Sequence, residues 1–89
     1  MSYYETDYPN LNEVVFVTID NFTDDAIYCR LVEYKNKEGF LPITELDKKV
    51  QPNPKKHFSE KKVYPMIVMD VDTDKGVIDV SYRRIKEID

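Results

Sequence analysis

The chain has 89 residues, of which 42% are hydrophobic and 34% charged, and a formal net charge of −4 at pH 7. A chain of this length builds one hydrophobic core rather than two, so we expect a single domain over residues 1–89. The acidic balance, with 17 Asp and Glu against 13 Lys and Arg, argues against a dedicated nucleic-acid-binding protein, because such proteins gain most of their affinity by neutralising phosphates.

Three runs rich in β-branched and aromatic residues predict the first three strands, at residues 14–19, 26–34 and 39–43. Turn-forming residues separate these runs at 20–25 and 35–38. The third run contains a proline, which cannot donate a hydrogen bond to a neighbouring strand. We therefore expect this strand to lie at an edge or to end at its proline.

The segment 47–62 predicts a long, exposed and lysine-rich loop, because six of the ten lysines of the chain lie in it. The residues just before it favour one helical turn capped by Thr44. Pro52 and Pro54 are expected to stop any helix there, since each proline restricts the residue before it to extended conformations. A long loop in a compact domain is usually functional.

Two further strands are predicted at residues 62–72 and 76–83, joined by a hairpin turn in which Gly76 is available for a positive φ. Short strands with one long connection between the third and the fourth favour a five-stranded closed or partly open barrel. A small β-sandwich is the alternative. Residues 1–10 are expected to be an N-terminal extension and residues 86–89 a tail.

An ordered set of short motifs runs from about residue 8 to residue 85. Its members are Tyr8-Pro9 followed by residues 13–15, then 31–34, then 38–40 with 44–46, and finally 71–79 with Arg83-Arg84. Together they resemble the N-terminal S1 domain of the alpha subunit of eukaryotic translation initiation factor 2, including the short poxvirus proteins that mimic it as kinase pseudosubstrates. The resemblance implies an all-β, five-stranded S1/OB-fold barrel with a long lysine-rich loop between strands 3 and 4.

Two departures from the cellular subunit point toward the mimics. In the cellular subunit that this chain resembles, the corresponding loop is arginine-rich and carries the serine that stress-activated kinases phosphorylate. Counted without a gap, Asn53 falls at the place of this serine, and an amide offers no oxygen nucleophile for phosphoryl transfer. Ser59, six residues later, is the alternative acceptor. The sequence also ends at Asp89, where the cellular subunit continues into further domains.

The resemblance also implies a surface that docks to the large lobe of such a kinase, remote from the acceptor. In this surface, Val77 stands where the family normally has an aromatic residue. The period of a strand predicts that one of Val77 and Ile78 faces inward and the other outward. The resemblance places the docking residues at Lys75, Gly76, Val77, Ile78, Asp79 and Tyr82, the last of which is more like the mimics than the cellular subunit.

The basic loop has two interpretations beyond a simply solvated surface. Its residues could meet the acidic substrate cleft of a kinase, or they could meet RNA phosphates. The acceptor-loop candidates are Lys48, Lys49, Asn53, Lys55 and Lys56.

Binding of RNA to the barrel itself would use aromatic side chains as stacking platforms. Tyr28 and Phe40 are the candidates for this role. Two features weigh against it, because Pro42 stands where RNA-binding S1 domains commonly have a histidine, and acidic residues lie nearby. These acids are Asp20, Asp24, Asp25 and Asp70.

No motif indicates catalysis, a cofactor or a metal, and we expect a protein that is not an enzyme. Cys29 is the single cysteine, which excludes an intrachain disulfide. His57 has no partner at metal-ligand spacing and is expected to be a surface residue. Asp70, Asp72 and Asp74 share one face of a strand but lack the loop of a calcium site, so a solvated hairpin explains them better.

The sequence therefore predicts a monomeric, cytoplasmic protein, without a signal peptide or membrane span, whose partner is a kinase of initiation factor 2 alpha. As a pseudosubstrate it would sustain translation initiation. The alternative is an isolated S1 domain of a divergent alpha subunit, with the translation initiation machinery or RNA as its partner.

Overall fold

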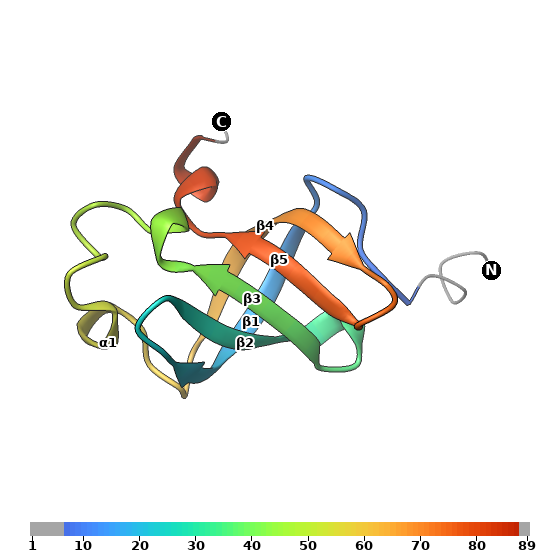
Figure 1. Cartoon of the computed structure of the whole chain (residues 1–89), viewed down its shortest axis with the longest axis horizontal. Helices are drawn as coiled ribbons and strands as arrows, with labels where there is room; N and C mark the ends of the chain where they lie inside the picture. Colours follow the sequence, from blue (N-terminus) through green and yellow to red (C-terminus); the bar gives the residue numbers. More distant parts are fainter. Residues whose placement is uncertain (1–6, 88–89) are drawn as a thin grey trace.

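A computed structural model describes residues 7–87 and shows a closed barrel of five strands in the order β1-β2-β3-β5-β4 (Figure 1). Neighbouring strands are antiparallel except β3 and β5, which pair in parallel. The predicted all-β barrel of five strands is confirmed. The strands are β1 (Val14–Phe22), β2 (Ala26–Leu31), β3 (Lys37–Pro42), β4 (Val63–Asp72) and β5 (Val77–Ser81).

Short helical turns occupy several strand ends, and two of them correct the sequence prediction. The second strand was expected to reach residue 34, but it ends at Leu31 and continues as the 3-10 turn η2 (Val32–Tyr34). Lys35 and Asn36 then adopt positive φ angles of 56° and 58°, and this left-handed pair turns the chain into β3.

The helical turn expected to be capped by Thr44 lies one residue earlier, as η3 (Ile43–Glu45), with Pro42 at its N-cap and no side-chain cap. Pro54 was expected to stop a helix and instead begins one, α1 (Pro54–His57). A proline is well suited to the first helical position, because its φ is already helical and its missing N–H has no partner there. A further 3-10 turn, η4 (Arg83–Glu87), follows β5.

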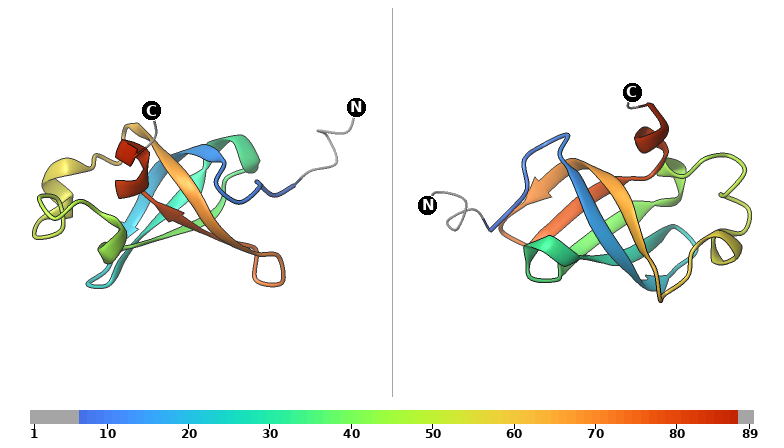
Figure 2. Two further views of the ribbon diagram at one scale, coloured as in Figure 1. Left: turned by 90° about the horizontal axis from the view of Figure 1, so that it is seen from above. Right: turned by 180° about the vertical axis from the view of Figure 1, so that it is seen from behind.

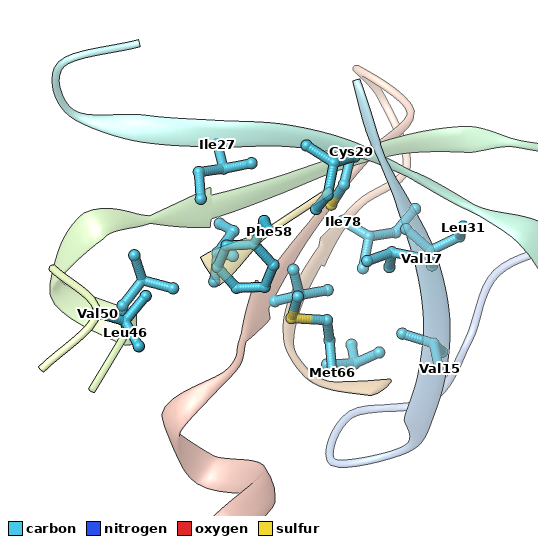
Figure 3. Packing of buried hydrophobic residues seen from close by; sticks show 14 residues of the cluster. Val15, Val17, Ile27, Cys29, Leu31, Leu46, Val50, Phe58, Met66 and Ile78 are labelled. Atoms are coloured by element: carbon cyan, nitrogen blue, oxygen red, sulfur yellow. The ribbon is translucent and has the colours of Figure 1, made fainter. Parts of the chain in front are cut away.

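The core fills the barrel with alternate side chains from every strand (Figure 3). Gly39 of β3 is buried where a Cβ atom would lie 2.7 Å from Cys29 Sγ and 2.9 Å from Leu31 Cδ1, so the barrel has no room for a larger residue there. The fully buried strand residues include Val15, Val17, Ile27, Cys29, Leu31, Leu41, Met66, Val68, Ile78 and Val80.

The loop between β3 and β4 is not exposed along its whole length, contrary to the sequence prediction. Val50 and Phe58 are buried, with exposed fractions of 8% and 4%, and Figure 3 shows the Phe58 ring among the strand residues of the core. In Figures 1 and 2 the loop with α1 occupies one end of the barrel, and the β4–β5 turn occupies the opposite end. The chain thus presents two separated ends.

Candidate protein-docking site

The basic loop presents its lysines to solvent. All six side chains that motivated the prediction are exposed, namely Lys48, Lys49, Lys55, Lys56, Lys61 and Lys62. From Asp47 to His57 the loop contains no serine, threonine or tyrosine. The exposed part of this loop therefore carries positive charge and offers no hydroxyl group.

Asn53 lies at the N-cap of α1 and is exposed. Its backbone N–H donates to Val50 O at 3.1 Å, and its carbonyl accepts from Lys56 N at 3.2 Å. The side-chain amide makes no capping hydrogen bond. It lines a surface hollow with Lys49, Pro52 and His57, so it is placed where a partner could contact it.

An aromatic cluster anchors the end of the loop to the barrel. The ring of Phe58 packs edge-to-face against His57 at 4.8 Å, Tyr64 at 4.8 Å and Tyr82 at 5.0 Å between centroids. His57 Nε2 lies 2.9 Å from the Tyr82 hydroxyl, so His57 is a bonded residue of this cluster as well as a surface residue. Burial is the main cause that raises the pKa of Tyr82 above its ordinary value.

The start of the loop is held by charged side chains from the C-terminal turn η4. Glu45 accepts a 2.6 Å hydrogen bond from Ser81 Oγ and forms ion pairs with Arg83 at 3.2 Å and Arg84 at 3.7 Å. Lys86 pairs with the carboxylate of Asp47, and this hydrogen bond raises the pKa of Lys86. Figure 2 shows η4 beside the start of the loop.

The predicted docking strand, β5, begins at the end of the barrel opposite to the loop and runs toward the loop. Lys75 is exposed at the far turn, where its N–H donates to Asp72 Oδ1 at 3.1 Å, and Gly76 has a φ of 71°. The expected alternation is confirmed, because Ile78 is fully buried while Val77 and Asp79 are half-buried on the outer face.

The structure does not bring the predicted docking residues into one patch. Tyr82 contacts the anchor of the loop, whereas Lys75 and Gly76 lie at the other end of β5.

The two aromatic candidates for RNA stacking are neighbours on the outside of the barrel. Tyr28 and Phe40 are paired across β2 and β3, and their rings meet edge-to-face at 5.5 Å. Both are half-buried and belong to the outer face, since their neighbours Ile27, Cys29 and Leu41 point into the core.

Sequence reasoning missed Phe58 and Glu45, which hold the two ends of the loop. Phe58 carries a recognisable signal, because it is the single aromatic side chain in the otherwise polar segment 51–62 apart from His57. Glu45 carries no such signal, since its partners Ser81, Arg83 and Arg84 are far away in sequence.

Within residues 7–87 the side chains of His, Cys, Asp and Glu form no group of three or more that could hold a metal ion. The described part of the chain also has no helix with the length and hydrophobicity needed to cross a membrane.

Comparisons with known proteins agree on one family. The S1 RNA binding domain model matches residues 8–83. Eukaryotic translation initiation factor 2 subunit 1 of Dictyostelium discoideum is 38% identical over 82 residues, which are 92% of this chain and 24% of that protein. The chain spans about a quarter of the length of the curated relatives it matches.

Solved structures that are similar to the barrel include the following two. A chain of the a/eIF2alpha-aDim2p-rRNA complex from Pyrococcus horikoshii has a TM-score of 0.80 and 32% identity, and the match covers 88% of this chain and 46% of that one. A protein from vaccinia virus (Wisconsin strain) has a TM-score of 0.63 and 26% identity, and the match covers 84% of this chain and 89% of that one.

Proposed function

This chain belongs to the S1 RNA-binding domain family and is related to initiation factor 2 alpha subunits, and on that premise we propose that it is a pseudosubstrate inhibitor of the kinases that phosphorylate that subunit. It would occupy such a kinase in the cytoplasm and so sustain translation initiation.

The main support for this proposal is the exposed, basic stretch from Asp47 to His57, which contains no hydroxyl group. A kinase transfers phosphate to a hydroxyl that is held in line with the γ-phosphate, while an aspartate takes its proton. An amide at Asn53, and every other side chain of this stretch, lacks that nucleophile. Lysines can still be attracted by an acidic cleft, so the loop can occupy the cleft without being modified.

Ser59, the one hydroxyl residue of segment 47–62, is placed unfavourably for transfer. It is half-buried beside Phe58, its backbone N–H donates to the Tyr64 hydroxyl at 2.7 Å, and its Oγ accepts from Lys61 N at 3.2 Å. Its partial burial and these hydrogen bonds disfavour presentation of the Ser59 hydroxyl to a kinase active site.

The outer side of β5 supports binding remote from the loop. Lys75, Val77 and Asp79 are accessible there, whereas Ile78 keeps the strand packed on the core. Remote contacts can supply the binding energy that holds a loop at an active site. Valine in place of an aromatic anchor weakens this contact by about 1–2 kcal/mol.

The test is an in vitro assay with such a kinase and the genuine alpha subunit as substrate. We expect the chain to lower phosphate incorporation into the subunit in a competitive manner and to incorporate none itself. Asn53 is the acceptor position that the resemblance implies, and Asp47 is the first residue of the stretch that lacks a hydroxyl group. Single serines introduced by Asn53→Ser and by Asp47→Ser should convert the inhibitor into a substrate at one of the two positions. Ser59→Ala is the control and should inhibit as well as the original chain. Phosphate on segment 47–62 of the original chain, or no inhibition at excess concentration, would contradict the proposal.

A second function is favoured by the similarity to a component of an archaeal complex that contains rRNA. The chain would then act as an initiation factor S1 domain that contacts the ribosome or RNA. Titration with single-stranded RNA at two salt concentrations distinguishes this function, because phosphate contacts weaken steeply as the salt concentration rises.

A further inference from the structure

The outside of the barrel carries a continuous row of side chains from four strands. The pairing registers place Tyr28 opposite Phe40, Phe40 opposite Asp79, and Asp79 opposite Asp70. Residues that are directly paired on one face of a sheet have side chains in reach of one another. The row therefore places two aromatic rings beside two carboxylates.

A second row lies beside the first, two residues further along each strand. It consists of Arg30, Glu38, Val77 and Asp72, again in register. We call the two rows the aromatic–acidic face, made of Tyr28, Phe40, Asp79, Asp70, Arg30, Glu38, Val77 and Asp72. No helix of the described chain covers it, as Figure 1 shows for the outside of β3 and β5.

Within the described residues, the carboxylates of this face have no cation paired with them. Arg30, its single cation, pairs with Asp20 at 3.3 Å and lies at the β2 end. Within residues 7–87 no ion pair joins Asp70, Asp72 or Asp79 to a cation. Burial and the neighbouring Asp70 and Asp72 raise the pKa of Asp79, as expected for carboxylates that repel one another.

We propose that the aromatic–acidic face binds an arginine-rich segment of a partner protein. A guanidinium group stacks on an aromatic ring and at the same time forms paired hydrogen bonds with a carboxylate. Phe40 beside Asp79, and Asp70 beyond it, provide both partners in adjacent positions. Arginine fits better than lysine because an ammonium group lacks the flat surface and the two-pronged donor geometry.

The same charges select against RNA at this face. Bases could stack on Tyr28 and Phe40, but their phosphates would approach Glu38, Asp70, Asp72 and Asp79. The lysines that could attract RNA lie on the loop at one end of the barrel. This binding does not depend on kinase inhibition. Val77 and Asp79 belong to both surfaces, whereas Tyr28 and Phe40 belong to this face and lie outside the predicted kinase-docking strand.

The experiment titrates the full chain with a fluorescent twelve-residue peptide of alternating arginine and glycine, and follows anisotropy and backbone amide shifts. We expect the largest shifts at Tyr28, Phe40 and Asp79. The variant Asp70→Asn with Asp79→Asn should bind about tenfold more weakly, since two partly exposed ion pairs are lost. Phe40→Leu should weaken binding about threefold while the barrel stays folded, as thermal unfolding checks.

Matched controls separate this site from general attraction to an acidic protein. Asp24→Asn with Glu60→Gln removes the same charge elsewhere and should leave the affinity within about twofold. A peptide with lysine in place of arginine should bind several times more weakly. Equal loss in the control variant, equal binding of the lysine peptide, or stronger binding of oligouridine to the same amides would each overturn the proposal.

Discussion

The basic loop (residues 47–62) and the aromatic–acidic face differ in how the molecule holds them in place. The face belongs to four strands, and the backbone hydrogen bonds between these strands fix the positions from which its side chains project. The loop has one short helix of its own and is held by a few side chains, chiefly Phe58 at its end and Glu45 just before its start. A single substitution can therefore release the loop, whereas the face can be displaced only by a change in the barrel itself.

The two regions also differ in charge, and the net value of −4 hides this difference. The loop carries six lysines against Asp47 and Glu60, whereas the face carries four carboxylates against Arg30. Such a separation of charge favours two different partners, because electrostatic complementarity governs encounter and partner choice. The substitutions below test the regions separately.

The largest effect is expected at the anchor of the loop. Phe58→Ala removes a ring that is 4% exposed and should lower the free energy of unfolding by about 3 kcal/mol, through lost burial and the cavity left behind. Trypsin should then cut at the loop lysines much faster. Phe16→Ala is the matched control, since that ring is 42% exposed, and it should cost less than half as much in urea unfolding. Equal costs would show that Phe58 is not an anchor.

The next effect concerns the frame of the aromatic–acidic face. Gly39→Ala places a methyl group 2.7 Å from Cys29 Sγ and should cost about 1–3 kcal/mol, because a filled core must shift to accept it. The free energy comes from urea unfolding. Adding Cys29→Ala should recover part of this loss by removing the sulfur, although Cys29→Ala alone destabilises the barrel. If the double variant loses as much free energy of unfolding as the two single variants lose together, the predicted clash is contradicted.

The face was more accessible to sequence reasoning than the loop, for a physical reason. A strand has a period of two, so the runs around Tyr28, Phe40 and Val77 already indicated which side chains alternate between core and surface. The register between strands could not be read in this way, because β3 and β5 are joined by a long connection that includes β4. The row from Tyr28 to Asp70 therefore became visible only in the structure.

The loop shows the opposite outcome. Its lysines correctly indicated exposed side chains, whereas Pro54 begins a helix that it was expected to stop. The polarity of the segment also concealed that Val50 and Phe58 are buried. The Glu45 ion pairs and the contact between His57 and Tyr82 join residues that are distant in sequence, so no local sequence pattern could predict them. Asn53 as the site of a missing acceptor stays a prediction of the resemblance.

A smaller effect tests the link between the loop and the end of β5. Tyr82→Phe keeps the ring and removes the hydroxyl that lies 2.9 Å from His57 Nε2, so the free energy of unfolding should fall by about 0.5–1 kcal/mol. Trypsin cleavage next to Lys55 and Lys56 should become faster. Tyr28→Phe, which removes a hydroxyl on the other region, is the control and should leave the loop unchanged. If both variants behave alike, the hydrogen bond does not restrain the loop.

The smallest effect is expected on the aromatic–acidic face. The pKa of Asp79 is raised in the folded barrel by burial and by Asp70 and Asp72, so the folded state binds this proton more tightly than the unfolded state. This carboxyl therefore favours folding at low pH, and that contribution is lost as the pH rises through its folded pKa.

Asp79→Asn removes a partly buried carboxylate that Asp70 and Asp72 repel. It should raise the free energy of unfolding at neutral pH by only a few tenths of a kcal/mol, because the side chain is partly exposed and screened by solvent. The gain should shrink toward zero below about pH 3, where the aspartate is largely protonated in both states. Thermal unfolding at the two pH values measures the difference, and Asp24→Asn separates it from a change in net charge. A gain that is larger at low pH than at neutral pH would show that the carboxylates of the face do not repel one another, and the case for a cationic partner there would lose its electrostatic basis.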